Sequence, residues 1–115
     1  MTEGQLLREI MLAVSSDKLK IFRNNCGVLQ DIHGQYIKYG VANPGGADCL
    51  GWKSTIIDSS MVGLTIAQFI AIEVKTSKGQ LTKEQKNFID QVRLAGGIAG
   101  VARSVKDALQ LLRQR

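Results

Sequence analysis

The sequence predicts an α/β fold in which helices flank a mixed sheet, with the elements in the order αβββαβα. Three segments place apolar side chains at the spacing of amphipathic helices: 2–14, 82–95 and 104–112. Two apolar runs, 66–72 and 98–102, have the length of buried strands. The alternation of these patterns indicates one sheet in a single domain that spans residues 1–115.

The first helix is expected to begin at Thr2-Glu3-Gly4-Gln5, which has the spacing of a capping box. On a helical wheel, Glu3 falls near the centre of the apolar stripe. Two interpretations of Glu3 stay open. An acid in the first turn is favoured by the helix dipole, and a carboxylate at that place is also suited to point toward a metal site.

Strand regions are expected at 18–25, 48–57 and 65–75. A short strand is also expected at 35–41. The turn at 43–47 contains the only proline and delivers Asp48 to the start of the second strand region. If the second and third strand regions pair in antiparallel fashion, Asp48 lies beside Glu73.

A second capping box, Thr82-Lys83-Glu84-Gln85, is expected to start the next helix, and Gly96-Gly97 to end it. Gln85 lies on the apolar stripe of this helix and therefore faces inward. Closing the capping box and acting in catalysis are both open as its role, and one side chain can switch between them.

Composition and charge restrict the classes of function. Fifteen Lys and Arg residues against ten Asp and Glu give a net charge of +5, which favours a polyanionic partner. Cys26, Cys49 and His33 are too few for a structural zinc site, so the cysteines are expected to be buried free thiols in a reducing cytoplasm. Without a signal peptide or an apolar run of about 20 residues, we expect a soluble protein with no membrane partner. We also expect no organic cofactor.

The apolar run at 66–72 leads into Glu73-Val74-Lys75. Because strand side chains alternate between faces, Glu73 and Lys75 leave the sheet on the same side and Val74 points into the core. A carboxylate and an ammonium are unlikely packing choices there, since each charge is costly to desolvate. The arrangement suits a metal ion and an attacking water.

Asp48 and Glu73 supply oxygen ligands in a chain with few nitrogen or sulfur ligands, which favours Mg²⁺ or Mn²⁺. The backbone carbonyl of Val74 would add another oxygen. Lys75 would position or polarise the attacking water, or stabilise a pentacovalent phosphate. These residues indicate phosphodiester hydrolysis by a metal-dependent nuclease.

Further polar and basic side chains are candidates for contacts with DNA phosphates: Arg23, Asn25, Lys78, Lys83 and Lys86. The alternative for each of them is an ordinary solvated surface residue.

These features resemble the VRR-NUC (virus-type replication-repair nuclease) branch of the PD-(D/E)xK nuclease superfamily, in its short stand-alone form of phages and bacteria. The segments that carry the resemblance span nearly the whole chain: Thr2–Glu3, Arg23–Gly27, Pro44–Asp48, Ile72–Lys75, Gln85 and Ala95–Ser104. The nominal proline–aspartate pair of the superfamily is interrupted here by Gly45-Gly46-Ala47. Asp48 must therefore be placed by the geometry of the turn.

The resemblance implies a restriction-endonuclease-like core with Asp48, Glu73 and Lys75 as its catalytic centre. It also implies Mg²⁺ or Mn²⁺ dependence, with Glu3 as the acid of the N-terminal helix and Gln85 as the polar residue of the following helix. Stand-alone members are similar to dimeric Holliday-junction resolvases. The resemblance thus implies a homodimer that cleaves branched DNA in the cytoplasm of a bacterial or phage-infected cell. A sequence- or flap-directed nuclease and a non-catalytic DNA-binding module are the alternatives.

Overall fold

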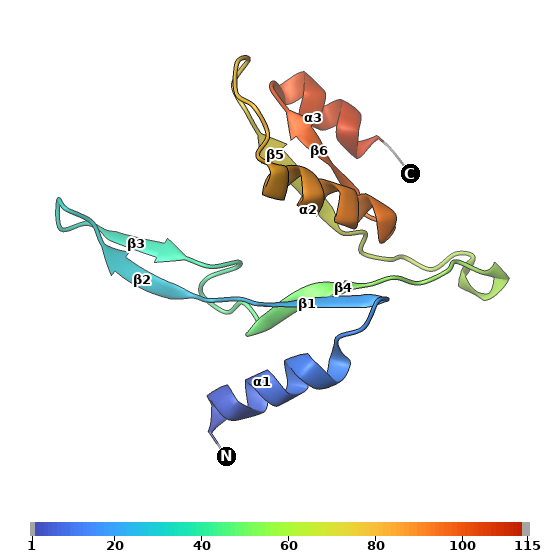
Figure 1. The fold of residues 1–115 in the computed structure, drawn as a ribbon, viewed down its shortest axis with the longest axis horizontal. Coiled ribbons are helices and arrows are strands. Elements are labelled where there is room, and N and C mark those ends of the chain that lie inside the picture. Colours follow the sequence, from blue (N-terminus) through green and yellow to red (C-terminus); the bar gives the residue numbers. More distant parts are fainter. Residues whose placement is uncertain (1, 114–115) are drawn as a thin grey trace. The chain divides into compact units, whose positions relative to one another are not determined.

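The computed structural model describes residues 2–113, and the chain divides into two compact units, Met1–Lys53 and Ser54–Arg115. We call them the N-terminal unit and the C-terminal unit. Figure 1 shows the helices and strands of each unit in chain order. Within residues 2–113, no helix combines the length and the apolar character that crossing a membrane requires.

The N-terminal unit begins with helix α1 (Glu3–Val14). The hydroxyl of Thr2 accepts a hydrogen bond from the Gln5 backbone N–H, and the Gln5 side chain accepts one from the Thr2 N–H. The predicted capping box is therefore confirmed. Helix α1 contacts strand β1.

Four strands of this unit form two antiparallel pairs. Strand β1 (Leu19–Arg23) pairs with β4 (Cys49–Lys53), and β2 (Gly27–Gln30) pairs with β3 (Tyr36–Tyr39). The rings of Phe22 and Trp52 lie 5.5 Å apart across the first pair. None of residues 2–53 is buried. Both cysteines are free as predicted, but their expected burial is wrong, because Cys26 is exposed and Cys49 is half-buried.

The C-terminal unit contains a parallel strand pair joined by a helix. Strand β5 (Ile70–Val74) pairs with β6 (Ile98–Ala102), and helix α2 (Lys83–Leu94) connects them. A helical crossover is the usual way to join parallel neighbours. Figure 1 shows α2 lying across the two strands and helix α3 (Val105–Leu112) beside β6. The buried hydrophobic side chains lie here: Ile89, Val92, Ile98, Ala99 and Ala102.

A short 3-10 helix, η1 (Ser59–Met61), precedes β5. The hydroxyl and backbone N–H of Ser60 both donate hydrogen bonds to the Asp58 carboxylate. These bonds favour the charged form and lower the pKa of Asp58. Asp58 therefore caps η1 as an anion.

The predicted mixed α/β class is confirmed, but five strands rather than three precede α2. Strand β4 pairs with β1, and β5 pairs in parallel with β6. The expected antiparallel ladder between regions 48–57 and 65–75 would join the two units and stays a prediction. Near-continuous apolar character, as at 70–72, is typical of parallel strands. Val74 is also not in a core: its side chain, at the end of β5, is 75% exposed.

Candidate active site

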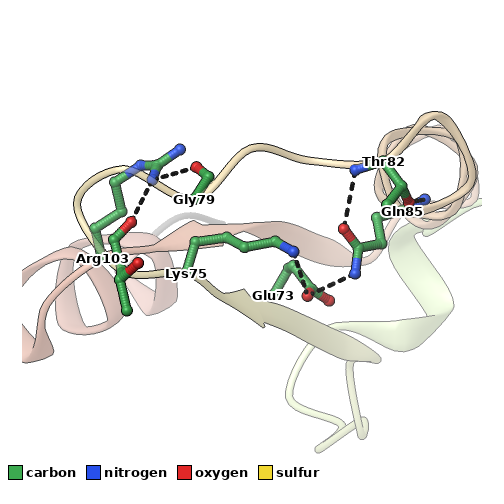
Figure 2. A network of polar contacts seen from close by, with 7 residues as sticks. Glu73, Lys75, Gly79, Thr82, Gln85 and Arg103 are labelled. Carbon is green, nitrogen blue, oxygen red and sulfur yellow. Dashed lines mark hydrogen bonds and ion pairs between the residues drawn. The ribbon is translucent and has the colours of Figure 1, made fainter.

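Glu73 and Lys75 project from the same side of the strand end, as their alternation predicts. The Lys75 Nζ lies 3.7 Å from Glu73 Oε1, and the two side chains are 20% and 33% exposed, respectively. Figure 2 shows the ammonium directed at the carboxylate. The backbone N–H of Lys75 donates to the Ala102 carbonyl, which extends the β5–β6 ladder by one residue. A partly buried ion pair therefore lies at the carboxyl end of β5.

Gln85 joins this pair from α2. Its Nε2 donates a hydrogen bond of 2.9 Å to Glu73 Oε1, while its Oε1 accepts one of 3.0 Å from the Thr82 backbone N–H (Figure 2). The sequence left a structural and a catalytic role open for Gln85. The two ends of its amide serve the helix cap and the carboxylate at the same time, so no switching is required.

A hollow of about 390 Å³ lies beside Glu73, between β5 and α2. Its polar lining consists of Glu73, Gln85 and Glu84, and its apolar lining includes Phe88 and Ile89. Glu84 is a residue that the sequence pattern did not single out, because it was read only as a middle position of the capping box. Its position in the first turn of α2, directly before Gln85, is the sequence signal that could have identified it.

The basic candidates of the C-terminal unit lie close in the sequence to residues that line this hollow. Lys83 opens α2, Lys86 lies one turn later, and Lys78 lies in the turn that follows β5. All three are exposed. They are thus accessible to a polyanion, as their proposed role requires.

Asp48 belongs to the N-terminal unit, where Asn24 holds the loop that leads to it. The Asn24 side chain donates to the carbonyls of Val41 and Ala47 and accepts from the Val41 N–H, at distances of 2.9, 3.0 and 2.9 Å. The Asn24 backbone N–H donates to the Asp48 carbonyl at 2.8 Å. The Asp48 side chain itself is exposed. The Asn24 side chain thus holds the backbone of the loop in place through these hydrogen bonds.

A second asparagine fixes the same loop from within. The Asn43 side-chain amide donates to the carbonyls of Gly27 and Tyr39, each at 2.8 Å. The Asn43–Pro44 peptide bond is cis, and Gly45 has φ +99°, a conformation that glycine adopts without strain. The interrupted proline–aspartate pair is therefore accommodated by a well-bonded loop.

The remaining candidates of the N-terminal unit are exposed. Arg23 ends β1, Asn25 lies between β1 and β2, and Glu3 is the first residue of α1. The position of Glu3 at the positive end of the helix dipole satisfies the structural interpretation of this acid.

The family model of the VRR-NUC domain matches this chain over residues 12–106. The chain belongs to the VRR-NUC family. No match to a curated protein or to a solved structure was found. VRR-NUC domains are nucleases of the PD-(D/E)xK type that act on DNA, so the fold class and the nucleic-acid partner expected from the sequence agree with the family.

The VRR-NUC match runs through both units. It includes Asp48, Glu73, Lys75 and Gln85, whereas Glu3 lies before its first residue.

The donor chemistry of the VRR-NUC site fits a hard divalent cation. Both contacts of the Glu73 carboxylate with described residues are made by Oε1, which leaves Oε2 as an oxygen ligand. Residues 2–113 contain no group of three or more His, Cys, Asp or Glu side chains that could hold a metal ion.

Proposed function

We propose that this VRR-NUC chain is a divalent-metal-dependent, structure-selective endodeoxyribonuclease that hydrolyses phosphodiester bonds at four-way DNA junctions. The observation that carries the proposal is the contact of Glu73 with both Lys75 and Gln85, at 3.7 and 2.9 Å. Desolvating a carboxylate and an ammonium together is costly. Such an arrangement at a strand end, in a family of nucleases, is best explained by catalysis.

Mg²⁺ or Mn²⁺, when bound, supplies a Lewis acid for the phosphoryl oxygens and lowers the pKa of a water. We assign its ligands to the carboxylates of Asp48 and Glu73 and to the backbone carbonyl of Val74. Glu3 is a further candidate, directly or through a water, and has the least support.

The protein's own groups have separate roles in this proposal. The Lys75 ammonium stabilises the negative charge that develops on the phosphate or holds the attacking water. Gln85 fixes the orientation of the Glu73 carboxylate by occupying its Oε1. The DNA backbone is held by exposed residues: Arg23, Asn25, Lys78, Lys83 and Lys86.

A homodimer would present two sites to the opposing strands of a symmetric junction. This part of the proposal follows from the resemblance to dimeric resolvases. Sedimentation of the protein with and without a junction measures it directly. A monomer bound to a single flap would instead support the flap-directed alternative.

The test compares cleavage of junction, flap, nicked and linear DNA with Mg²⁺ or Mn²⁺, using wild type, Lys75→Ala and Asp48→Asn. We expect cleavage of the junction first, and a loss of about a hundredfold or more in each variant, as for removal of a charge-stabilising group. Equal turnover of all substrates would overturn the junction selectivity while leaving a nuclease.

Binding without cleavage under any divalent ion, unchanged by a chelator, would replace the enzyme with a DNA-binding module. Retention of full activity by Asp48→Asn would remove Asp48 from the catalytic set.

A further inference from the structure

Arg103, at the end of β6, reaches back over the turn that follows β5. Its Nη1 donates hydrogen bonds to two backbone carbonyls of that turn, Thr76 at 2.6 Å and Gly79 at 2.7 Å. Figure 2 shows the Arg103 guanidinium and its hydrogen bond to the Gly79 carbonyl. The Arg103 backbone N–H donates to the Asp107 carboxylate at 2.9 Å, so the start of α3 anchors the residue. Charged donors form the stronger class of hydrogen bond.

The turn at 76–79 lies against the side chain of Lys75. A Cβ atom at Gly79 would lie 3.3 Å from Lys75 Cδ, which is closer than ordinary van der Waals contact, and 3.4 Å from Lys75 Cβ, at the near limit of such contact. Glycine therefore lets the turn backbone approach the lysine stem. This approach accompanies the low exposure of the Lys75 side chain, 20%.

Little else holds the turn closed. Among residues 2–113, its other hydrogen bond is the one from the Gly79 N–H to the Thr76 carbonyl, at 3.1 Å, within the turn itself. Two carbonyls that converge on one point repel each other unless a donor lies between them. The Arg103 guanidinium supplies that donor.

We propose that Arg103 is a positioning residue that clamps the 76–79 turn over Lys75 and thereby keeps the Lys75 ammonium beside Glu73. Its role in cleavage rests on the proposed nuclease function, but the clamp itself does not. Arg103 was not among the DNA-binding candidates, and both carbonyls that it contacts belong to the protein.

The clamp is tested by trace labelling of lysines with acetic anhydride at one fixed pH, quantified by mass spectrometry and normalised to exposed Lys20. Arg103→Met removes the donors, Arg103→Lys keeps a charged donor, and Lys106→Met removes an equal charge from exposed α3. We expect Arg103→Met to label Lys75 about fivefold faster or more, because charge-assisted bonds are lost. Arg103→Lys and Lys106→Met should resemble wild type. Arg103→Ala, which also has no side-chain donor, replaces the methionine variant if the latter fails to fold.

Single-turnover cleavage and DNA affinity are measured on the same proteins. We expect Arg103→Met to cleave about tenfold more slowly with unchanged affinity for DNA, and Arg103→Lys to recover the rate, since misplacing a catalytic group by an ångström is costly.

Unchanged labelling of Lys75 in folded Arg103→Met would overturn the clamp. Weaker DNA binding with unchanged labelling would also overturn it and make Arg103 a phosphate contact. Faster labelling in a chain whose wild type cleaves no DNA would uphold the clamp and overturn the nuclease function.

Discussion

The two capping boxes of this chain are nearly identical in local structure and differ in what surrounds them. In α1 the Gln5 Oε1 accepts from the Thr2 N–H at 2.8 Å, and in α2 the Gln85 Oε1 accepts from the Thr82 N–H at 3.0 Å. Among the contacts of residues 2–113, the Gln85 amide also donates to a carboxylate, that of Glu73, and the Gln5 amide does not. The comparison teaches that a local motif fixes a side chain's conformation, whereas tertiary structure decides whether that side chain has a chemical role.

The largest expected difference between the two helices follows from replacing the glutamine of each capping box with glutamate. Glutamate closes a capping box as well as glutamine does, so Gln5→Glu and Gln85→Glu should both keep their helices. In Gln85→Glu, however, a second carboxylate faces Glu73, and like charges at this distance disfavour each other's ionised form. We expect cleavage to fall about a hundredfold in Gln85→Glu, the scale on which catalytic charge stabilisation is lost, and to be unchanged in Gln5→Glu.

Initial rates of DNA cleavage on the two variants measure this difference, with helix content by circular dichroism as the control. Equal rates in both variants would mean that the Gln85–Glu73 contact has no role in catalysis.

A smaller difference is expected from the N-cap threonines. Thr2→Ala and Thr82→Ala each remove a hydroxyl that accepts from the glutamine N–H, which should cost about 1 kcal/mol in the free energy of unfolding. Thr82→Ala should also slow cleavage a few-fold, because a frayed first turn holds Gln85 less firmly. Denaturant unfolding and cleavage rates of Thr2→Ala and Thr82→Ala check these expectations. Serine at either position should restore the free energy of unfolding and the cleavage rate. A slower rate in Thr2→Ala than in Thr82→Ala would reverse the comparison.

The smallest effects concern the acids in the first turns, Glu3 in α1 and Glu84 in α2. Each should stabilise its helix by about 0.5 kcal/mol through the helix dipole. Glu3→Gln and Glu84→Gln are therefore expected to lower the free energy of unfolding by similar small amounts. A loss of Mn²⁺ affinity in Glu3→Gln, measured by electron paramagnetic resonance, would instead assign Glu3 to the metal site.

The features that were predicted correctly from the sequence depend on residues close to one another in the chain. Both capping boxes, the three helices and β6 follow from spacing within a few turns of chain, and the shared face of Glu73 and Lys75 follows from strand alternation. The parallel pairing of β5 with β6 was not expected, because alternation does not specify which distant strand supplies the ladder. Strand β2 was not expected at all.

The contacts that hold the candidate site were also beyond the sequence patterns. Asn24 lies between two candidates for phosphate contacts, Arg23 and Asn25, but its side chain bonds the backbone at Val41 and Ala47. Arg103 bonds a turn that ends 24 residues before it. Such side-chain-to-backbone bonds depend on folded geometry and leave no periodic signal.

The most direct test of the central claim is the rate of DNA cleavage by Glu73→Gln with saturating Mn²⁺, compared with wild type and with Asp90→Asn, an exposed acid of α2. Glutamine keeps the shape of the side chain and removes its charge. We predict that Glu73→Gln cleaves no faster than wild type in chelator, while Asp90→Asn keeps the wild-type rate. Cleavage by folded Glu73→Gln within about twofold of wild type would contradict the account, since removal of a true transition-state contact costs far more.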